Sequence, residues 1–211
     1  MRGIRPEGSV NDRTEGGQPM TLYLHMRQRG VTTLGPGSRY GIWVAGCHRN
    51  CPGCVAPDSH DMTKGTPIET GALSWEILLS NSDGLTISGG EPFLQAEALA
   101  ELVRTVRRRQ DLGVIVYTGF LLEELEQLPG AAALLEQTDL LIDGPYVREL
   151  DDGLSLRGSS NQRVHLLTPR YADALSLYGT GERKTEVFHH GFTTHYVGIP
   201  TDSKYEKEHI V

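Results

Sequence analysis

The sequence predicts an α/β protein built on a mainly parallel sheet with outer helices. Short apolar segments alternate with amphipathic ones in the order strand, helix, strand, helix, strand. The expected strands are runs of Val, Ile and Leu without polar alternation, which is typical of parallel strands that helices cover. The length of 211 residues fits one domain with extensions.

The expected elements follow one another from residue 21 onward. A first strand is expected at 22–26, and a turn-rich segment at 31–41 separates it from a short apolar strand at 42–46. Amphipathic spacing predicts helices, and continuous apolar runs predict further strands. The helices are expected at 72–81, 95–109, 121–128 and 131–137, and the further strands at 84–88, 113–117 and 139–142.

Three segments of different composition divide the chain. Residues 1–20 are polar and glycine-rich without apolar periodicity, which indicates a flexible leader. Residues 21–167 contain the predicted sheet and form the core. Residues 168–211 form a less regular C-terminal extension with an aromatic and histidine-rich stretch at 188–200. For its histidines we expect exposed or packing roles rather than metal binding.

Composition excludes several classes of function. Twenty basic and 27 acidic residues give a net charge of −7, which argues against binding along a nucleic-acid backbone. No run approaches the ~18 apolar residues that a membrane span needs. The first twenty residues also lack the apolar segment of a secretory signal. We therefore expect a cytoplasmic protein with neither nucleic acid nor membrane as a partner.

Small, polar and thiol-bearing residues follow four of the predicted strands, at the point where each strand ends. These residues are Cys47, the turn Gly89, Gly90 and Glu91, and further along Thr118 and Asp143. Ligand-binding groups collect at the carboxyl ends of parallel strands. Two glycines in succession permit close backbone approach to a ligand, and a carboxylate beside them can accept from a cationic group. Each position alone also fits an ordinary turn or cap, but their shared placement predicts one binding site.

All three cysteines of the chain, Cys47, Cys51 and Cys54, fall in one loop with the spacing C-x3-C-x2-C. An odd number of clustered thiols does not suit a disulfide framework and indicates metal or redox chemistry. Three thiolates would leave one iron of a four-iron cluster without a protein ligand, which is a place for substrate to bind. A zinc site that adds His48 or His60 remains the alternative at this stage.

The combined motifs resemble the radical S-adenosylmethionine (SAM) enzymes. Within that group they resemble the activating proteins of anaerobic ribonucleoside-triphosphate reductase, which are glycyl-radical-enzyme activases. The resemblance lies between residues 35 and 167, in the stretches GPGSRYGIWVAGCHRNCPGC, LTISGGEPFLQ, VIVYTGF, LLIDGPYV and RGSSNQRVHLL. It implies an incomplete (β/α) barrel of the radical SAM type and replaces the zinc hypothesis.

The resemblance also implies roles for individual residues. The three cysteines would hold a [4Fe–4S] cluster, whose fourth iron binds the amino and carboxylate groups of SAM. Gly89, Gly90 and Glu91 would hold the amino group of SAM, and Thr118 and Asp143 would contact SAM at neighbouring strand ends. A signature of the subfamily is matched by Arg157, Ser159, Asn161 and Gln162, which would bind SAM or organise the last strand.

The implied activity is reductive cleavage of SAM to a 5′-deoxyadenosyl radical, which would make a glycyl radical on a partner such as an anaerobic ribonucleotide reductase. A one-electron donor such as flavodoxin or ferredoxin would reduce the cluster. Members of the subfamily end soon after the Asn-Gln-Arg segment, whereas this chain continues for about 45 residues. The extension leaves a peptide or small-molecule substrate as an alternative. A non-catalytic iron–sulfur electron carrier would not explain Gly89, Gly90 and Glu91.

Overall fold

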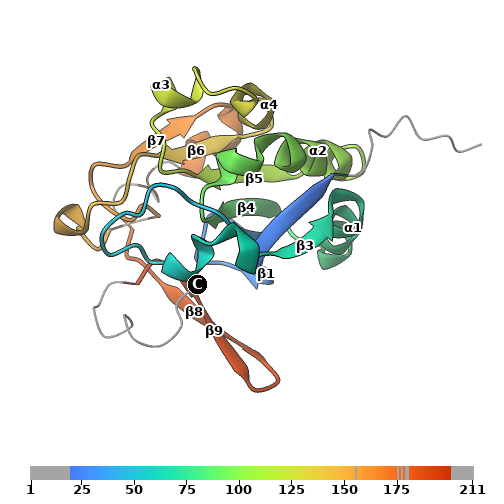
Figure 1. Cartoon of the computed structure of the whole chain (residues 1–211), viewed down its shortest axis with the longest axis horizontal. Helices are drawn as coiled ribbons and strands as arrows, with labels where there is room; N and C mark the ends of the chain where they lie inside the picture. Colours follow the sequence, from blue (N-terminus) through green and yellow to red (C-terminus); the bar gives the residue numbers. More distant parts are fainter. Residues whose placement is uncertain (1–19, 155, 175, 177, 179–180, 201–211) are drawn as a thin grey trace, which may run out of the picture.

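A mixed seven-stranded sheet forms the centre of the molecule in a computed structural model (Figure 1). The structure describes residues 20–200, apart from 155, 175, 177, 179 and 180. The strand order is β3-β1-β2-β4-β5-β6-β7, and β8 and β9 form a separate two-stranded hairpin. The predicted leader and residues 201–211 of the predicted extension lie outside the described residues, apart from Met20.

The elements have the following bounds. The strands are β1 (Thr21–Val31), β2 (Arg39–Val44), β3 (Thr66–Glu69), β4 (Gly84–Gly89), β5 (Gly113–Tyr117), β6 (Leu140–Asp143), β7 (Arg163–Leu166), β8 (Thr185–His190) and β9 (Thr193–Gly198). The α-helices are α1 (Thr70–Ser80), α2 (Ala96–Arg107), α3 (Leu122–Leu125) and α4 (Ala131–Leu135). Short 3₁₀ segments lie at Pro57–Ser59, Met62–Lys64, Pro92–Gln95, Arg148–Leu150 and Pro169–Ala174.

Parallel pairing is confined to the four central strands. β2, β4, β5 and β6 pair in parallel, while β1, β3 and β7 are antiparallel to their neighbours. The prediction of an α/β protein with a mostly parallel central sheet is thus confirmed. The edge strands β3 and β7 are short and mostly exposed or half-buried, so they carry little of the apolar signal that located the central strands.

One face of the sheet packs against helices α1, α2, α3 and α4. Alternate residues of the strands, such as Ile42, Ile87 and Val116, share a buried cluster with Leu99 and Val103 of α2. Helix α2 places its apolar side chains on this face and its arginines in solvent or in ion pairs, as its amphipathic pattern predicts. The helices therefore cover one face of the sheet, and they leave the carboxyl ends of the central strands uncovered.

The opposite face of the sheet is covered by the segment that follows β7. Trp43 of β2 packs with Val197 of β9, and Ile115 and Ile142 pack with Tyr171 and with a second buried tyrosine, Tyr178. Because successive side chains of a strand point to opposite faces, these residues lie on the side away from the helices. The C-terminal segment thus takes part in the core, while the hairpin tip extends away from the sheet (Figure 1).

None of the helices in the described residues is both long enough and apolar enough to cross a bilayer.

Candidate active site

A cavity of about 980 Å³, part of which is open to solvent, lies at the carboxyl ends of the central strands. Seven of the eight predicted site residues line it. They are Cys47, Cys51, Cys54, Gly89, Gly90, Glu91 and Thr118. The loop with the cysteines and the Gly-Gly-Glu turn, 35 residues apart in the sequence, thus share one cavity.

Backbone hydrogen bonds fasten the Gly-Gly-Glu turn to the start of the cysteine loop. The Gly90 N–H donates to the Val44 carbonyl at 2.8 Å, and the Glu91 N–H donates to the Gly46 carbonyl at 2.7 Å. These bonds continue the parallel register of β2 and β4 past the ends of the strands. The relative position of the cysteine loop and the Glu91 carboxylate is therefore set by the sheet itself.

The two glycines are required by this close approach of two backbones. A Cβ on Gly89, whose φ is +100°, would lie 2.5 Å from the Val44 nitrogen. A Cβ on Gly90 would lie 2.2 Å from the Gly46 carbonyl oxygen. Only glycine permits both contacts. The sequence suggested close approach to a ligand, whereas in this structure the nearest backbone belongs to the end of β2 for Gly89 and to Gly46, directly before the cysteine loop, for Gly90.

The three cysteines are free thiols and are half-buried along the cavity. Burial raises the pKa of the Cys47 and Cys54 thiols. Thiols bind metals as thiolates, so metal binding at these residues would release their protons. Nε2 of His60 lies 3.3 Å from the Cys54 sulfur, whereas His48 is exposed. Among the described residues no group of three His, Cys, Asp or Glu side chains is arranged to hold a metal ion.

Glu91 is almost fully buried at 1% exposure, and its carboxylate is held by three donors. Oε1 accepts from the Phe93 N–H at 3.0 Å and from the Thr118 hydroxyl at 2.8 Å, while Oε2 accepts from the Gly119 N–H at 2.8 Å. Burial raises the pKa of Glu91 against the opposing effect of these bonds. A carboxylate oxygen accepts two hydrogen bonds, so Oε2 keeps room for a donor from a ligand.

Thr118 supports Glu91 directly. Its hydroxyl donates to Glu91 Oε1 and accepts from the Phe120 N–H at 3.1 Å, so both of its hydrogen bonds stay within the protein. Thr118 is 4% exposed and still lines the cavity. The structure therefore gives this hydroxyl a positioning role in the site.

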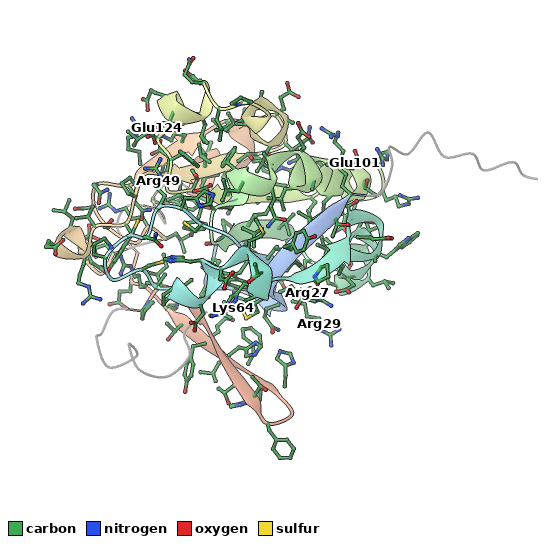
Figure 2. All side chains as sticks on the ribbon, in the orientation of Figure 1. Arg27, Arg29, Arg49, Lys64, Glu101 and Glu124 are labelled. Carbon is green, nitrogen blue, oxygen red and sulfur yellow. The ribbon has the colours of Figure 1, made fainter. Side chains whose placement is uncertain are left out.

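Arg49 is a cavity residue that the sequence reasoning missed. It lies between Cys47 and Cys51, and its Nη2 is 2.6 Å from Oε2 of Glu124 (Figure 2). Its guanidinium also lies over the Phe120 ring, 4.3 Å from the centroid. These contacts fasten the cysteine loop to the start of α3. The sequence held no local signal for them because both partners lie more than 70 residues away.

Asp143 differs from the other predicted site residues because it is not among those that line the cavity. Its fully buried carboxylate accepts from the Leu122 N–H at 2.7 Å and from Arg163 Nε at 3.0 Å, and it lies 3.0 Å from His165 Nε2. Burial alone would raise the pKa of Asp143, but Arg163, the Leu122 N–H and His165 together lower it. In this structure the carboxylate joins β6, β7 and α3.

The signature segment after β6 organises the loops beside the cavity. Oε1 of Gln162 accepts from the Gly158 N–H at 2.7 Å, and its Nε2 donates to the Gly144 carbonyl at 2.8 Å. The Asn161 amide donates to the Pro145 carbonyl, the Ser159 hydroxyl accepts from the Val147 N–H, and Arg157 pairs with Asp152. Gln162, Gly158 and Gly144 line the cavity, so these bonds shape its rim.

Comparisons with known proteins identify the family of this chain. Residues 33–165 match a family model described as a 4Fe-4S single cluster domain. The match covers the cysteine loop, the Gly-Gly-Glu turn and every strand from β2 to β6. The chain is therefore an iron–sulfur protein of the class with a single four-iron cluster, and the alternative of a zinc site is wrong.

Several relatives bear the name anaerobic ribonucleoside-triphosphate reductase-activating protein, among them one from Vibrio cholerae and one from Escherichia coli. The one from Vibrio cholerae is 34% identical over 144 residues, which are 64% of this chain and 91% of the relative. The one from Escherichia coli is 35% identical over 147 residues, or 63% of this chain and 91% of the relative. The pyruvate formate-lyase 1-activating enzyme of Escherichia coli is 28% identical over 149 residues, or 67% of this chain and 58% of that protein.

The chain belongs to the family of anaerobic ribonucleoside-triphosphate reductase-activating proteins. It is an activating enzyme of the glycyl-radical type, as the sequence motifs predict. Membership implies a [4Fe–4S] cluster and SAM as its cofactors.

Proposed function

We propose that this protein cleaves SAM reductively and uses the resulting 5′-deoxyadenosyl radical to remove a hydrogen atom from a backbone glycine of a partner enzyme. One observation carries the proposal: the three cysteines and the Glu91 carboxylate line the same cavity at the strand ends. The relatives are named for activating an anaerobic ribonucleoside-triphosphate reductase, so we propose an enzyme of that kind as the partner.

We propose Cys47, Cys51 and Cys54 as the ligands of the cluster. Their donor set fits it, because three free thiols on one short loop supply soft ligands to three irons and leave the fourth iron open to SAM. When bound and reduced, the cluster supplies the electron that breaks the C5′–S bond of SAM. The chain itself holds the loop in place through Arg49 and through the backbone bonds of the Gly-Gly-Glu turn.

We propose that Glu91 binds the amino group of SAM through the free capacity of Oε2. The carboxylate is held in position by Thr118 and by two backbone N–H groups, so little conformational freedom is lost when an ammonium group binds. Burial strengthens such a charge-assisted bond. Gly89 and Gly90 let the turn lie against the cysteine loop, and Asp143 stays a prediction as a SAM contact.

The finer architecture and partners also belong to the proposal. We propose that the sheet is an incomplete barrel of the radical SAM type, with residues 21–167 as its core, preceded by residues 1–20 and followed by an extension at 168–211. The reductant would be a flavodoxin or ferredoxin of the cytoplasm, where thiols stay reduced. An open barrel leaves one side from which a loop of a protein partner can reach the cofactors.

A peptide or small-molecule substrate remains the second candidate, because Gly198 and Ile199 of the extension line the same cavity. They take up room that a partner loop would otherwise use. A glycyl radical on a protein partner separates the two candidates.

The activity is tested by incubating the anaerobically reconstituted, reduced protein with SAM and measuring 5′-deoxyadenosine by chromatography. We expect turnover in the wild type and none in Cys51→Ala, because the variant lacks one cluster ligand. Glu97→Gln, at an exposed position of α2 outside the cysteine loop, serves as the control. Absence of 5′-deoxyadenosine from wild-type protein with an intact cluster would contradict the proposal.

A further inference from the structure

We propose that residues 182–199, which include the β8–β9 hairpin, form a fixed wall of the cysteine-lined cavity and limit access to the cluster. The inference rests on the proposed function in one respect, because it takes the cluster to be bound at the three cysteines. It assigns a role to a segment beyond residue 165, where the match to the family model ends.

The end of the segment is itself part of the cavity. Gly198 and Ile199 line the cavity together with the three cysteines and Glu91. Trp43 and Leu34 line it too, and both pack beneath the hairpin in the cluster that contains Val197. The surface from the cysteine loop to the hairpin is therefore continuous, and the segment closes one side of the cavity.

Apolar packing is the first of three contacts that hold the wall in place. Val197 of β9 is 0% exposed and lies among Met26, Val31, Leu34 and Trp43. Burial of its side chain in such an apolar cluster stabilises the closed position of the hairpin. By contrast, Val187 on the neighbouring strand is 49% exposed, so the hairpin has one packed face and one face in solvent.

Glu186 of β8 provides the second contact. Its carboxylate accepts four hydrogen bonds at 2.8–3.0 Å, from the backbone N–H groups and the hydroxyls of Thr32 and Thr33. The two threonines follow β1 directly, at the start of the loop that contains Leu34. A single side chain thus ties the hairpin to the loop beneath it.

Arg183 provides the third contact, at the start of the segment. Its side chain is almost fully buried, and Nη1 lies 2.7 Å from Oδ1 of Asp151. Its Nη2 donates to the carbonyls of Arg157 and Gly158 at 2.6 and 2.7 Å. Gly158 lines the cavity as well, so Arg183 joins the segment to the signature loop on another part of the rim.

Contacts of three kinds on separate parts of the core distinguish a wall from a loose tail. A segment held this way stays closed except when all three contacts open together. The cluster is then reached only through the part of the cavity that the segment leaves open, and a target must enter by that route.

The wall is tested by measuring the rate at which a ferrous-iron chelator removes iron from the reconstituted, anaerobically reduced holoenzyme. Val197→Asp places a charge in the apolar contact, and we expect iron loss about tenfold faster than in the wild type because the open state gains population. Val187→Asp, the same change on the exposed face of the hairpin, should leave the rate within about twofold of the wild type. Circular dichroism checks that each protein is folded.

A milder pair of variants keeps the test decisive if Val197→Asp does not fold. Glu186→Gln removes one of the two acceptor oxygens that bind Thr32 and Thr33, and we expect a smaller but measurable acceleration of iron loss. Glu182→Gln is its control, since Glu182 is exposed. Equal rates for a variant and its control, whether both are unchanged or both are accelerated, would overturn the proposal.

The readout separates this inference from the proposed function. Iron loss requires only a bound cluster and no cleavage of SAM. A wild-type protein that yields no 5′-deoxyadenosine, yet loses iron faster in Val197→Asp, would contradict the proposed function and support the wall. SAM cleavage by the wild type, together with equal rates of iron loss in Val197→Asp and Val187→Asp, would support the proposed function and contradict the wall.

Discussion

At the scale of single residues, Glu91 combines burial with incomplete hydrogen bonding. Three protein donors fix the carboxylate, and one oxygen remains able to accept from a ligand. A buried acceptor with spare capacity favours a cationic donor, since an ion pair in a low-dielectric site is stronger than in water. This arrangement is the basis for placing the SAM ammonium group beside Glu91.

We expect Glu91→Gln to weaken SAM binding by about ten- to a hundredfold, because a hydrogen bond to a charged group contributes about 1.5–3 kcal/mol. The measurement is calorimetric titration of SAM into the reconstituted protein. Glu97→Gln, on the exposed side of α2, is the control and should bind SAM as the wild type does. An unchanged dissociation constant in Glu91→Gln would show that the amino group binds elsewhere.

The close contact between Gly90 and the Gly46 carbonyl leads to a prediction about how the cysteine loop is held in place. Gly90→Ala would place a methyl group 2.2 Å from the Gly46 carbonyl oxygen, so the loop must move. We expect a loss of about 1–3 kcal/mol in the free energy of unfolding, together with a lower iron and sulfide content after reconstitution.

The matched control for that change is Gly71→Ala. Gly71 lies in α1, and a Cβ there meets no atom within 4 Å. Alanine in a helix is favoured over glycine by about 0.5–1 kcal/mol, so this variant should be slightly more stable. Thermal unfolding of both variants checks the difference, and full cluster content in Gly90→Ala would refute the close-approach argument.

At the scale of elements, the edge formed by β6, β7 and α3 depends on ionised Asp143. Its pKa lies below the ordinary value of 3.8, so the ionised carboxylate stabilises the folded state above about pH 4. That contribution is lost as the pH falls through the lower pKa of the folded protein. Arg163, which also binds Glu123 of α3, is the main partner.

We expect Asp143→Asn to lower the free energy of unfolding by about 2 kcal/mol at neutral pH, since it replaces charge-assisted hydrogen bonds. The difference from the wild type should shrink as the pH falls below about 4, because the wild-type carboxylate then becomes protonated. Chemical denaturation at a series of pH values measures this difference. A difference that stays constant down to pH 2 would rule out the ionised network.

At the scale of the whole molecule, the sequence predicted the parallel strands at the centre of the sheet but not the strands at its edges. Continuous apolar runs placed β2, β4, β5 and β6, because strands buried on both faces carry that pattern. The short strands β3 and β7 form because they pair with β1 and β6. A single sequence contains no signal for such pairing between strands. The strand ends predicted one site for Glu91 and the cysteines, and in the structure these residues line one cavity; their roles there stay predictions.

Long-range contacts account for what the sequence did not reveal. The Arg49–Glu124 pair and the four bonds to Glu186 join segments that are 75 and more than 150 residues apart. The cover over the second face of the sheet comes from a segment without regular periodicity. These features follow from the three-dimensional packing, so only the structure places Gly198 and Ile199 at the cavity.

The central claim is that the cofactors of this protein generate a glycyl radical on a partner. Its most direct test is electron paramagnetic resonance of an anaerobic ribonucleoside-triphosphate reductase from the same organism, incubated with the reduced protein and SAM. We expect the doublet of a glycyl radical with wild-type protein and no signal with Cys51→Ala. SAM cleavage without any doublet would contradict the claim and favour a peptide or small-molecule substrate.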